Sequence, residues 1–254
     1  MKILLTGSSG YLGSELAKLI RESTELELIL FDRNKPFEYD EIDVLINCGA
    51  HGVKYPHDTL RNLVEKNYLF QRGYISKLID SGSLKRIIQI GSCWEYGLSL
   101  NKGPVTEFSE EYPIDPYSVS KFLLHQWLVS ECKSREISYL NCRLFHLFGG
   151  HSEPKYRFYS QLRTAALSGS DFEMSKGEIV RDFVRIEDAV NQILVEVRSD
   201  KQGVKFIASG KSITLAEFAQ KHWSQFQATG KLLIGALDSR ENEIQKIIIK
   251  KWKE

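Results

Sequence analysis

Short apolar segments alternate with longer amphipathic ones through the first 150 residues, and this alternation constrains the fold more than any other feature. The apolar segments are KILLT (2–6), ELELILFD (25–32), DVLINCGA (43–50), KRIIQIGS (85–92) and SYLNCRLF (138–145). Periodicity predicts helices over 11–23, about 58–80 and roughly 117–135. Apolar strands joined by amphipathic crossovers are typical of a parallel sheet covered on both faces. The sequence therefore predicts an α/β fold with a Rossmann-type doubly wound parallel sheet.

Beyond Gly149 the alternation becomes irregular, which indicates a change of role. Helices are predicted in RFYSQLRTAALSG, in the second half of DFVRIEDAVNQILVEV and in TLAEFAQKHWSQF, and a strand in GVKFIASG. From Ser239 to the end, isoleucines and Trp252 fall on one helical face and predict a last, packed helix. We expect one domain over residues 1–150, to which segments near 180–208 return, and a small C-terminal α+β region over most of 151–254.

Composition argues against several classes of protein. Hydrophobic residues make up 42% and charged residues 26%, as in an ordinary globular protein. A net charge of +1 argues against a nucleic-acid partner. The start, MKILLTG, has neither a signal peptide nor a membrane span, and four cysteines without a CxxC pair indicate reduced thiols in the cytoplasm. The six histidines lack ligand spacing, so no metal site is predicted.

A glycine-rich turn, TGSSGYLGSEL, lies between the first predicted strand and the first helix. A dinucleotide requires small residues here because the backbone turns tightly and the pyrophosphate approaches the N–H groups at the helix start. Dinucleotide-binding folds also carry an acid about 20 residues further on, for the ribose hydroxyls. Asp32 ends the second predicted strand and matches that acid. The predicted cofactor-binding residues of the turn are Gly7, Gly10, Tyr11, Leu12 and Gly13.

Two neighbouring residues bear on the choice between NAD and NADP. The carboxylate of Asp32 would repel the 2′-phosphate of NADP, which favours NAD. Arg33, directly beside it, would attract the same phosphate. We therefore expect NAD and leave NADP open. A glycine turn that binds no ligand is the alternative interpretation.

The segment YSVSK (117–121) places Tyr117 and Lys121 one turn apart on a predicted helix. A free tyrosine has a pKa of about 10, too high for a base at neutral pH. A nearby ammonium would stabilise the phenolate and lower this pKa, and Lys121 could also bond the nicotinamide ribose. By itself this spacing is more often found on a solvated helix face. Its position after a dinucleotide turn favours a role in proton transfer.

Four motifs occur in order, namely Gly7-x-x-Gly10-x-x-Gly13, GSCWEYG (91–97), Tyr117-x-x-x-Lys121 and RDFVRIEDA (181–189). Together they resemble the extended short-chain dehydrogenase/reductase family, in its NAD-dependent nucleotide-sugar epimerase, dehydratase and ketoreductase branch. The resemblance implies an enzyme acting on a nucleoside-diphosphate sugar. Residues 1–150 would bind NAD(P) and residues 151–254 mainly the substrate. It also implies a homodimer formed through helices 58–80 and 117–135.

The catalytic residues that the resemblance implies are Ser92, Tyr117 and Lys121, and it counts Tyr117 and Lys121 among the cofactor-binding residues as well. Ser92 would hydrogen-bond the substrate oxygen at the carbon that exchanges hydride; the alternative is a strand-end serine that only caps a turn. Dehydratases of this branch carry an Asp-Glu pair directly after this position, where this chain has Cys93 and Trp94. Glu95 is one place late and would point to the other face. Dehydration is therefore not expected, while 4-epimerisation and 4-keto reduction both stay open.

The resemblance also implies contacts for residues outside the catalytic set. Ala50 would let the adenosine approach the third strand, and Asn67 matches an asparagine of the family's long helix. Arg181, and Arg240 in a GALDSRENE segment (235–243) similar to a substrate-binding turn, would bind the diphosphate. His151 matches an acid/base histidine of a related GDP-sugar enzyme, or is a loop histidine without that task.

Two further functions are compatible with these residues. A reductase of another carbonyl compound would share the proton-transfer pair, but the arginine of RDF favours a diphosphate substrate. A non-catalytic dinucleotide sensor would be expected to have lost the serine, the tyrosine or the lysine, and all three are present. An enzyme acting on a nucleotide sugar is therefore the preferred interpretation.

Overall fold

A six-stranded parallel sheet forms the centre of the molecule. The computed structural model describes residues 1–34, 41–53, 58–239 and 244–250. The strand order is β2-β1-β3-β4-β5-β9, and each neighbouring pair is parallel. The strands are β1 (Lys2–Thr6), β2 (Glu27–Leu30), β3 (Val44–Asn47), β4 (Arg86–Ser92), β5 (Ser138–Leu144) and β9 (Gly203–Ile207). The predicted doubly wound fold is confirmed.

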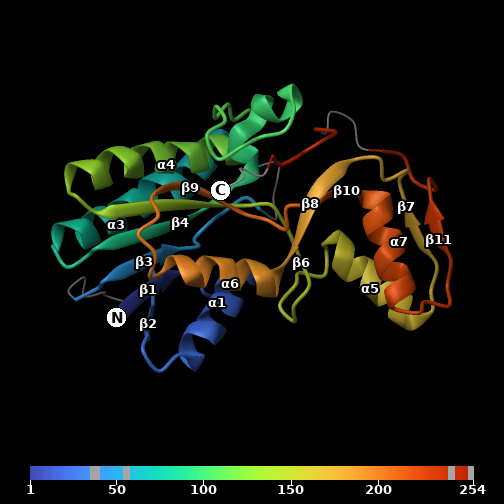
Figure 1. The fold of residues 1–254 in the computed structure, drawn as a ribbon, viewed down its shortest axis with the longest axis horizontal. Helices are drawn as coiled ribbons and strands as arrows, with labels where there is room; N and C mark the ends of the chain where they lie inside the picture. The colour runs from blue at the N-terminus through green and yellow to red at the C-terminus, as the bar shows by residue number, and fades with distance from the viewer. Residues whose placement is uncertain (35–40, 54–57, 240–243, 251–254) are drawn as a thin grey trace.

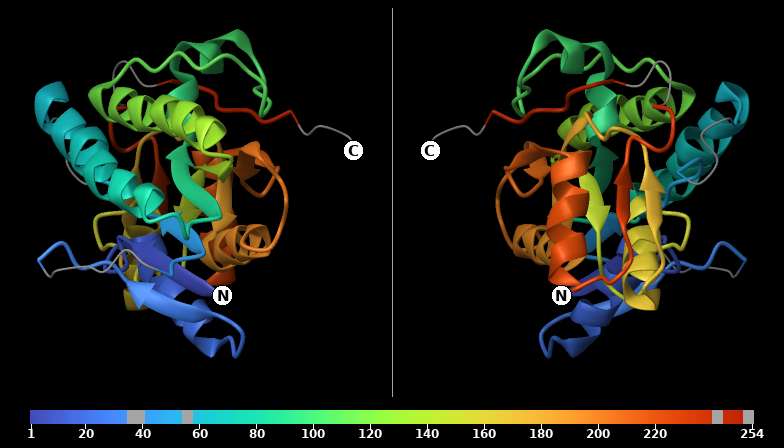
Figure 2. Two further views of the ribbon diagram at one scale, coloured as in Figure 1. Left: turned by 90° about the vertical axis from the view of Figure 1, so that its left-hand side faces the viewer. Right: turned by 90° about the vertical axis from the view of Figure 1, so that its right-hand side faces the viewer.

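Helices cover both faces of this sheet (Figures 1 and 2). One face carries α1 (Tyr11–Glu22) and α6 (Ile186–Glu196), and the other carries α3 (Phe70–Asp80) and α4 (Pro116–Ser134). Because successive side chains of a strand point to opposite faces, Ile3 and Leu5 pack in the first core and Leu4 in the second. The inner strands β1, β3, β4 and β5 are buried on both faces, which explains why their apolar residues do not alternate with exposed polar ones.

The predicted helix over 58–80 contains a widened turn at its middle. It consists of α2 (Leu60–Val64), the π-helical segment η1 (Glu65–Leu69) and α3. Its start is capped by Thr59, whose hydroxyl accepts a hydrogen bond from the backbone N–H of Asn62 at 3.2 Å. The π turn carries the fully buried Asn67. Such turns are frequent at functional sites.

A smaller region lies at one end of the main sheet, on the right of Figure 1. It contains a three-stranded sheet of β10 (Ser212–Thr214), β8 (Val180–Arg185) and β6 (His146–Phe148), and a pair formed by β7 (Phe172–Met174) and β11 (Leu232–Ile234). Helices α5 (Phe158–Ser168) and α7 (Leu215–Gln225) pack against each other here. Between β8 and β10 the chain returns to the main sheet through α6 and β9.

Residues 244–250 form an extended segment, named here the C-terminal strap, so the helix predicted from Ser239 is wrong for these residues. The strap exchanges backbone hydrogen bonds with Val180 of β8 and with Val105, at 2.8 to 2.9 Å. Isoleucines three residues apart fit a helical face, but their β-branched side chains also suit extended backbone. Ile247 is fully buried, and the position of Trp252 lies outside the described residues.

We predict that Ile247→Ala lowers the free energy of unfolding by about 2–5 kcal/mol, because the strap loses its one fully buried side chain. Ile114→Ala is the matched control, since Ile114 is 52% exposed and its truncation should change stability by less than about 0.5 kcal/mol. Urea denaturation of both variants measures the difference. Equal stabilities would contradict the packing of the strap.

Candidate active site

The topology predicts a ligand site at the carboxyl end of the sheet. The chain proceeds from β1 outward to β2 and then crosses to β3 on the other side of β1. In open α/β sheets, ligands bind where the strand order reverses in this way. The predicted site residues of the glycine turn follow β1, Asp32 follows β2, Ala50 follows β3, and Ser92 ends β4. All four segments therefore reach the same edge of the sheet.

The glycine turn is formed by close backbone contacts that side chains would prevent. Gly7 has a φ of +64°, and a Cβ there would lie 2.8 Å from the carbonyl carbon of Cys48. A Cβ on Gly13 would lie 2.1 Å from the Gly7 oxygen, so α1 can pack onto the turn only through glycine. Among the described residues α1 has no side-chain cap and no acid in its first turn. Its N–H groups are thus free to bind an anion, and the turn fits a pyrophosphate.

Other predicted cofactor residues surround this turn. Phe31 donates its N–H to Leu5 at 3.0 Å, which carries β2 alongside β1 as far as Asp32. One carboxylate oxygen of Asp32 accepts from the Asn34 N–H at 3.0 Å, and Arg33 is exposed in the same turn. The Tyr11 hydroxyl donates to the carbonyl of Gly149 at 2.6 Å, which joins the turn to the end of β6. Leu12 is buried in the core, and Ala50 is exposed in the loop after β3.

Ser92 is buried at the end of β4 and caps the following 3₁₀ segment η2 (Cys93–Lys102). Its hydroxyl oxygen accepts from the Trp94 N–H at 3.3 Å, and its own N–H donates to Glu95 at 2.7 Å. The alternative role as a turn cap is thus present in the structure. Because the hydroxyl proton takes no part in the cap, the same side chain could still donate to a substrate oxygen.

The start of α4 fixes the positions of Tyr117 and Lys121. Asp115 accepts from the Ser118 N–H at 3.0 Å, and Pro116 occupies the first helical position, which together define where the helix begins. Lys121 is 3% exposed and lies within electrostatic range of Cys48, the residue that follows β3. Since the backbone of Cys48 also contacts the glycine turn, the lysine and the turn approach the same strand end.

The ionisation of the pair differs from the sequence expectation. Desolvation raises the pKa of Tyr117, and the carboxylates of Glu95 and Asp115 raise it further. Desolvation lowers the pKa of Lys121, and Glu95 opposes this change. The lowering of the tyrosine pKa by Lys121 that we expected is therefore not found. A phenol that keeps its proton is suited to donating it.

Asn67 joins the loop after β3 to α4. Its side-chain amide donates to the His51 carbonyl at 2.9 Å and to the Ser120 hydroxyl at 3.0 Å, and its oxygen accepts from the His51 N–H at 2.7 Å. The Ser120 hydroxyl in turn donates to the carbonyl of Tyr117 at 2.7 Å. The side chain therefore ties α4 to the loop after β3, and its predicted contact with the cofactor stays a prediction.

The residues predicted to bind a diphosphate are less closely grouped. Arg181 is 2% exposed and donates to carbonyl oxygens of β8 and the strap, at 2.7 to 3.2 Å. His151 is exposed in the loop after β6, and Arg240 lies outside the described residues.

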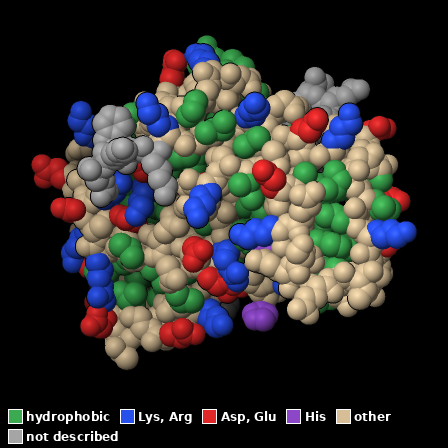
Figure 3. Space-filling view, turned by 45° about the vertical axis from the view of Figure 1, so that its right-hand side comes forward, with side chains coloured by type: hydrophobic (Ala, Val, Ile, Leu, Met, Phe, Trp, Pro, Cys, Tyr) green, Lys and Arg blue, Asp and Glu red, His purple; other side chains and the backbone are tan. Residues whose placement is uncertain are grey.

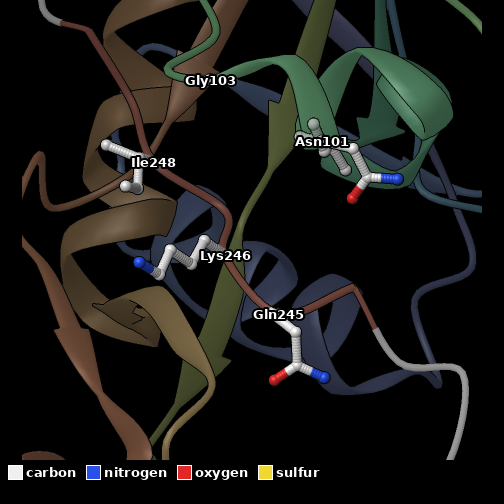
Figure 4. Close-up of a pocket in the computed structure, with 6 residues that line it drawn as sticks. Asn101, Gly103, Gln245, Lys246 and Ile248 are labelled. Atoms are coloured by element: carbon white, nitrogen blue, oxygen red, sulfur yellow. The ribbon is translucent and has the colours of Figure 1, made fainter.

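A separate pocket of about 290 Å³ lies beside the strap (Figure 4). It is lined by Leu100, Asn101, Gly103, Gln245, Lys246 and Ile248.

Sequence reasoning missed residues that only the fold brings to the site. Glu95 is fully buried and contacts Arg143, also fully buried, at 3.4 Å. His146 lies with its ring 6.1 Å from that of Trp94, and burial lowers its pKa to about 3. An arginine inside the apolar run SYLNCRLF was the one available signal, since a buried charge needs a partner. Within the described ranges, no cluster of three potential metal ligands occurs.

Comparisons with known proteins agree with this arrangement. Residues 3–208 match the NAD dependent epimerase/dehydratase family. The chain is 25% identical to a dTDP-6-deoxy-L-talose 4-dehydrogenase (NAD(+)) of Aggregatibacter actinomycetemcomitans, over 87% of this chain and 91% of that protein. It is 20% identical to UDP-arabinose 4-epimerase 1 of Arabidopsis thaliana, over 86% of this chain and 65% of that protein.

A solved structure is similar over almost the whole chain. The UDP-glucose 4-epimerase of Thermotoga maritima, solved with UDP-glucose, superposes with a TM-score of 0.82 at 20% identity. The superposition covers 98% of this chain and 90% of that one. At this identity the likeness establishes the fold.

We predict that Gly13→Ala destabilises the protein by about 1–3 kcal/mol, because the added Cβ overlaps the carbonyl oxygen of Gly7. Gly73→Ala in α3 is the control: nothing lies within 4 Å of its Cβ, so relief of glycine's helix penalty should stabilise by about 0.5–1 kcal/mol. Chemical denaturation measures the free energy of unfolding of both variants, which should change in opposite directions. A neutral Gly13→Ala would contradict the close packing of the turn.

Proposed function

The chain belongs to the NAD dependent epimerase/dehydratase family, and from this membership we propose that it exchanges hydride between NAD and C4 of a nucleoside-diphosphate sugar. The membership confirms the resemblance drawn from the four motifs. One observation carries the proposal: Ser92 and the pair of Tyr117 and Lys121 belong to segments that approach the same sheet edge as the glycine turn. Proton-transfer groups and a pyrophosphate cradle at one edge are what such a reaction requires.

Each residue of the site has a definite task under this proposal. The glycine turn and Asp32 hold NAD, which supplies hydride transfer when bound. Ser92 donates its hydroxyl proton in a hydrogen bond to the sugar oxygen at C4. Tyr117 transfers a proton to or from that same oxygen. Lys121, one turn along α4 from Tyr117, would bond the ribose next to the nicotinamide and supply a positive charge on the same helix face.

Reduction of a 4-keto sugar, with the reverse oxidation, is the first candidate reaction. The phenol of Tyr117 keeps its proton, as a donor to a keto oxygen should. The relative that matches over 91% of its own length is named a 4-dehydrogenase. Epimerisation at C4 is the second candidate. The two are distinguished by NADH: a reductase consumes it in proportion to product, whereas an epimerase interconverts sugars with no net change in cofactor.

The substrate and the cofactor are proposed to occupy different parts of the chain. Residues 1–150, with the returning β8, α6 and β9, would bind NAD, and residues 151–254 would supply most contacts to the sugar nucleotide. Asp32 supports NAD over NADP because its carboxylate would repel a 2′-phosphate. Arg181 is a candidate for the diphosphate, although in this structure its guanidinium donates to carbonyl oxygens of the strap. Arg240 and His151 remain candidates for the same ligand.

A homodimer and a cytoplasmic location complete the proposal. Leu60, Leu69 and Phe70 are 46–53% exposed on the α2–η1–α3 segment, and α4 adds the partly exposed Leu123 and Val129. These helices lie side by side in both views of Figure 2 and would form a two-fold interface.

The proposed cytoplasmic location fits the four cysteines, all of which are free. In the part of the chain that is described, no helix is long and apolar enough to cross a membrane. Figure 3 shows interspersed positive and negative side chains, which gives a nucleic acid no continuous basic track on that face.

We predict that Tyr117→Phe lowers kcat/KM for the nucleotide-sugar substrate by about 10²–10⁴-fold, because proton transfer to the C4 oxygen is lost. Binding of NAD, followed by calorimetry, should change little. The control is Tyr112→Phe, since Tyr112 is 51% exposed in the preceding loop. A panel of nucleoside-diphosphate sugars and their 4-keto forms provides the substrates. Full activity of Tyr117→Phe would remove the catalytic assignment.

We predict that Leu69→Lys converts the dimer to a monomer, because a charge is placed in the apolar interface. Leu167→Lys, on α5 and 69% exposed, should leave the dimer intact. Light scattering after size-exclusion chromatography measures the mass of each. A wild-type monomer at micromolar concentration would contradict the proposed dimer.

A further inference from the structure

A chain of buried charges runs beneath the catalytic serine. Glu95 and Arg143 are both fully buried, with 3.4 Å between Oε2 and a guanidinium nitrogen. The same nitrogen contacts Glu111, whose further partners are His125 at 3.2 Å and Gln126 at 3.0 Å. The guanidinium carbon of Arg143 also lies 4.3 Å from the ring centre of Tyr96. Glu95 and Arg143 come from η2 and β5, which are separated by α4 in the sequence.

Burial of this kind is energetically unfavourable without a function or a full set of partners. Removing a carboxylate from water costs several kcal/mol, and an ion pair recovers this only with good geometry. Here Glu95 and Glu111 both contact Arg143, so one positive charge is shared between two negative ones. Replacing a buried ion pair with well-packed apolar residues is often neutral or stabilising. Glu95 is retained here with partners on both oxygens, because it also completes a capping box with Ser92 and accepts from the Asn141 amide at 3.5 Å.

Glu95 reaches the catalytic residues through its second oxygen. Oε1 accepts the N–H of Ser92 at 2.7 Å and so fixes the backbone at the end of β4. The carboxylate also lies close enough to Tyr117 and Lys121 to act on both of their ionisations. It thus contacts Ser92 directly, and its charge acts on the ionisation of the other two residues.

We propose that Glu95 is a positioning residue for proton transfer, holding the Ser92 amide from beneath and setting the negative charge that Tyr117 and Lys121 face. This inference rests on the proposed function and adds a fourth residue to it. The carboxylate takes no proton from the substrate in this role. It keeps the serine hydroxyl in place and keeps the phenol protonated, which suits Tyr117 as the proton donor.

The groups that shift the pKa of Tyr117 and Lys121 allow the effect of Glu95 to be measured separately from that of Glu111. Tyr117 is influenced by Glu95 from η2, by Asp115 at the start of its own helix and by Cys93. Lys121 is influenced by Glu95 and by Cys48 after β3. Glu111 contacts the same nitrogen of Arg143 as Glu95 does, but it is not among the main groups that shift the pKa of Tyr117 or Lys121. Two carboxylates therefore share one arginine, and only Glu95 also bonds the Ser92 amide.

Glu95→Gln tests the charge, with Glu111→Gln as the matched control. In the direction of sugar oxidation, kcat rises with pH as Tyr117 ionises. Removing the Glu95 charge lowers the pKa of Tyr117, so the rising limb of the curve of kcat against pH should move to lower pH in Glu95→Gln. The same limb should stay at the wild-type pH in Glu111→Gln. An unmoved limb in Glu95→Gln, or an equal shift in both variants, overturns the proposal.

Glu95→Asp tests the hydrogen bond and also serves if Glu95→Gln fails to fold. The shorter side chain keeps the charge but withdraws from the Ser92 N–H. The loss of one hydrogen bond is worth about 0.5–1.5 kcal/mol, so kcat should fall about 2- to 12-fold with the limb in place. An unchanged kcat in Glu95→Asp would overturn the positioning role.

A titration without turnover separates this inference from the proposed function. The phenolate absorbance of each protein, minus that of its Tyr117→Phe counterpart, reports the ionisation of Tyr117 alone. Its onset should occur at lower pH in Glu95→Gln than in wild type, and at the wild-type pH in Glu111→Gln. If no nucleotide sugar is turned over, the proposed function fails, while this titration still supports or overturns the effect of Glu95.

Discussion

The contact between α1 and the glycine turn is the constraint on which the site depends. Because Gly13 packs onto the carbonyl of Gly7, the helix starts directly above the end of β1. The same turn contacts the backbone of Cys48, so the ends of β1 and β3 are held at one spacing. Lys121 approaches that strand end from the opposite layer. A side chain in the turn would therefore separate the anion-binding helix start from the proton-transfer pair.

The fold could be predicted because its main rules are local. A strand buried on both faces is apolar at every position, and the helices between strands carry their own periodicity. The strap could not be predicted in this way. Isoleucines at 244, 247 and 248 fit a helical face, and the decisive hydrogen bonds come from Val105 and Val180, far away in the sequence. Tertiary pairing thus overrode a local pattern.

In the candidate site, too, features that depend on local spacing could be predicted and features that depend on tertiary contacts could not. Tyr117 and Lys121 lie on one helix, so their common face follows from their spacing alone. Glu95 falls one place too late for the acidic pair of a dehydratase, and the structure directs its side chain into the core, where it contacts Arg143. Its partner lies on a strand 48 residues later. The expected pKa of Tyr117 failed for a related reason, since spacing reveals the ammonium but not the desolvation of the phenol.

These charges give the site a preferred direction. A phenolate at Tyr117 would be desolvated and would face two carboxylates, whereas the neutral phenol carries no such penalty. The protein's own groups therefore favour the proton donor over the base. Donation to a keto oxygen proceeds from this state directly, while oxidation of a hydroxyl first requires the ionisation that Glu95 opposes.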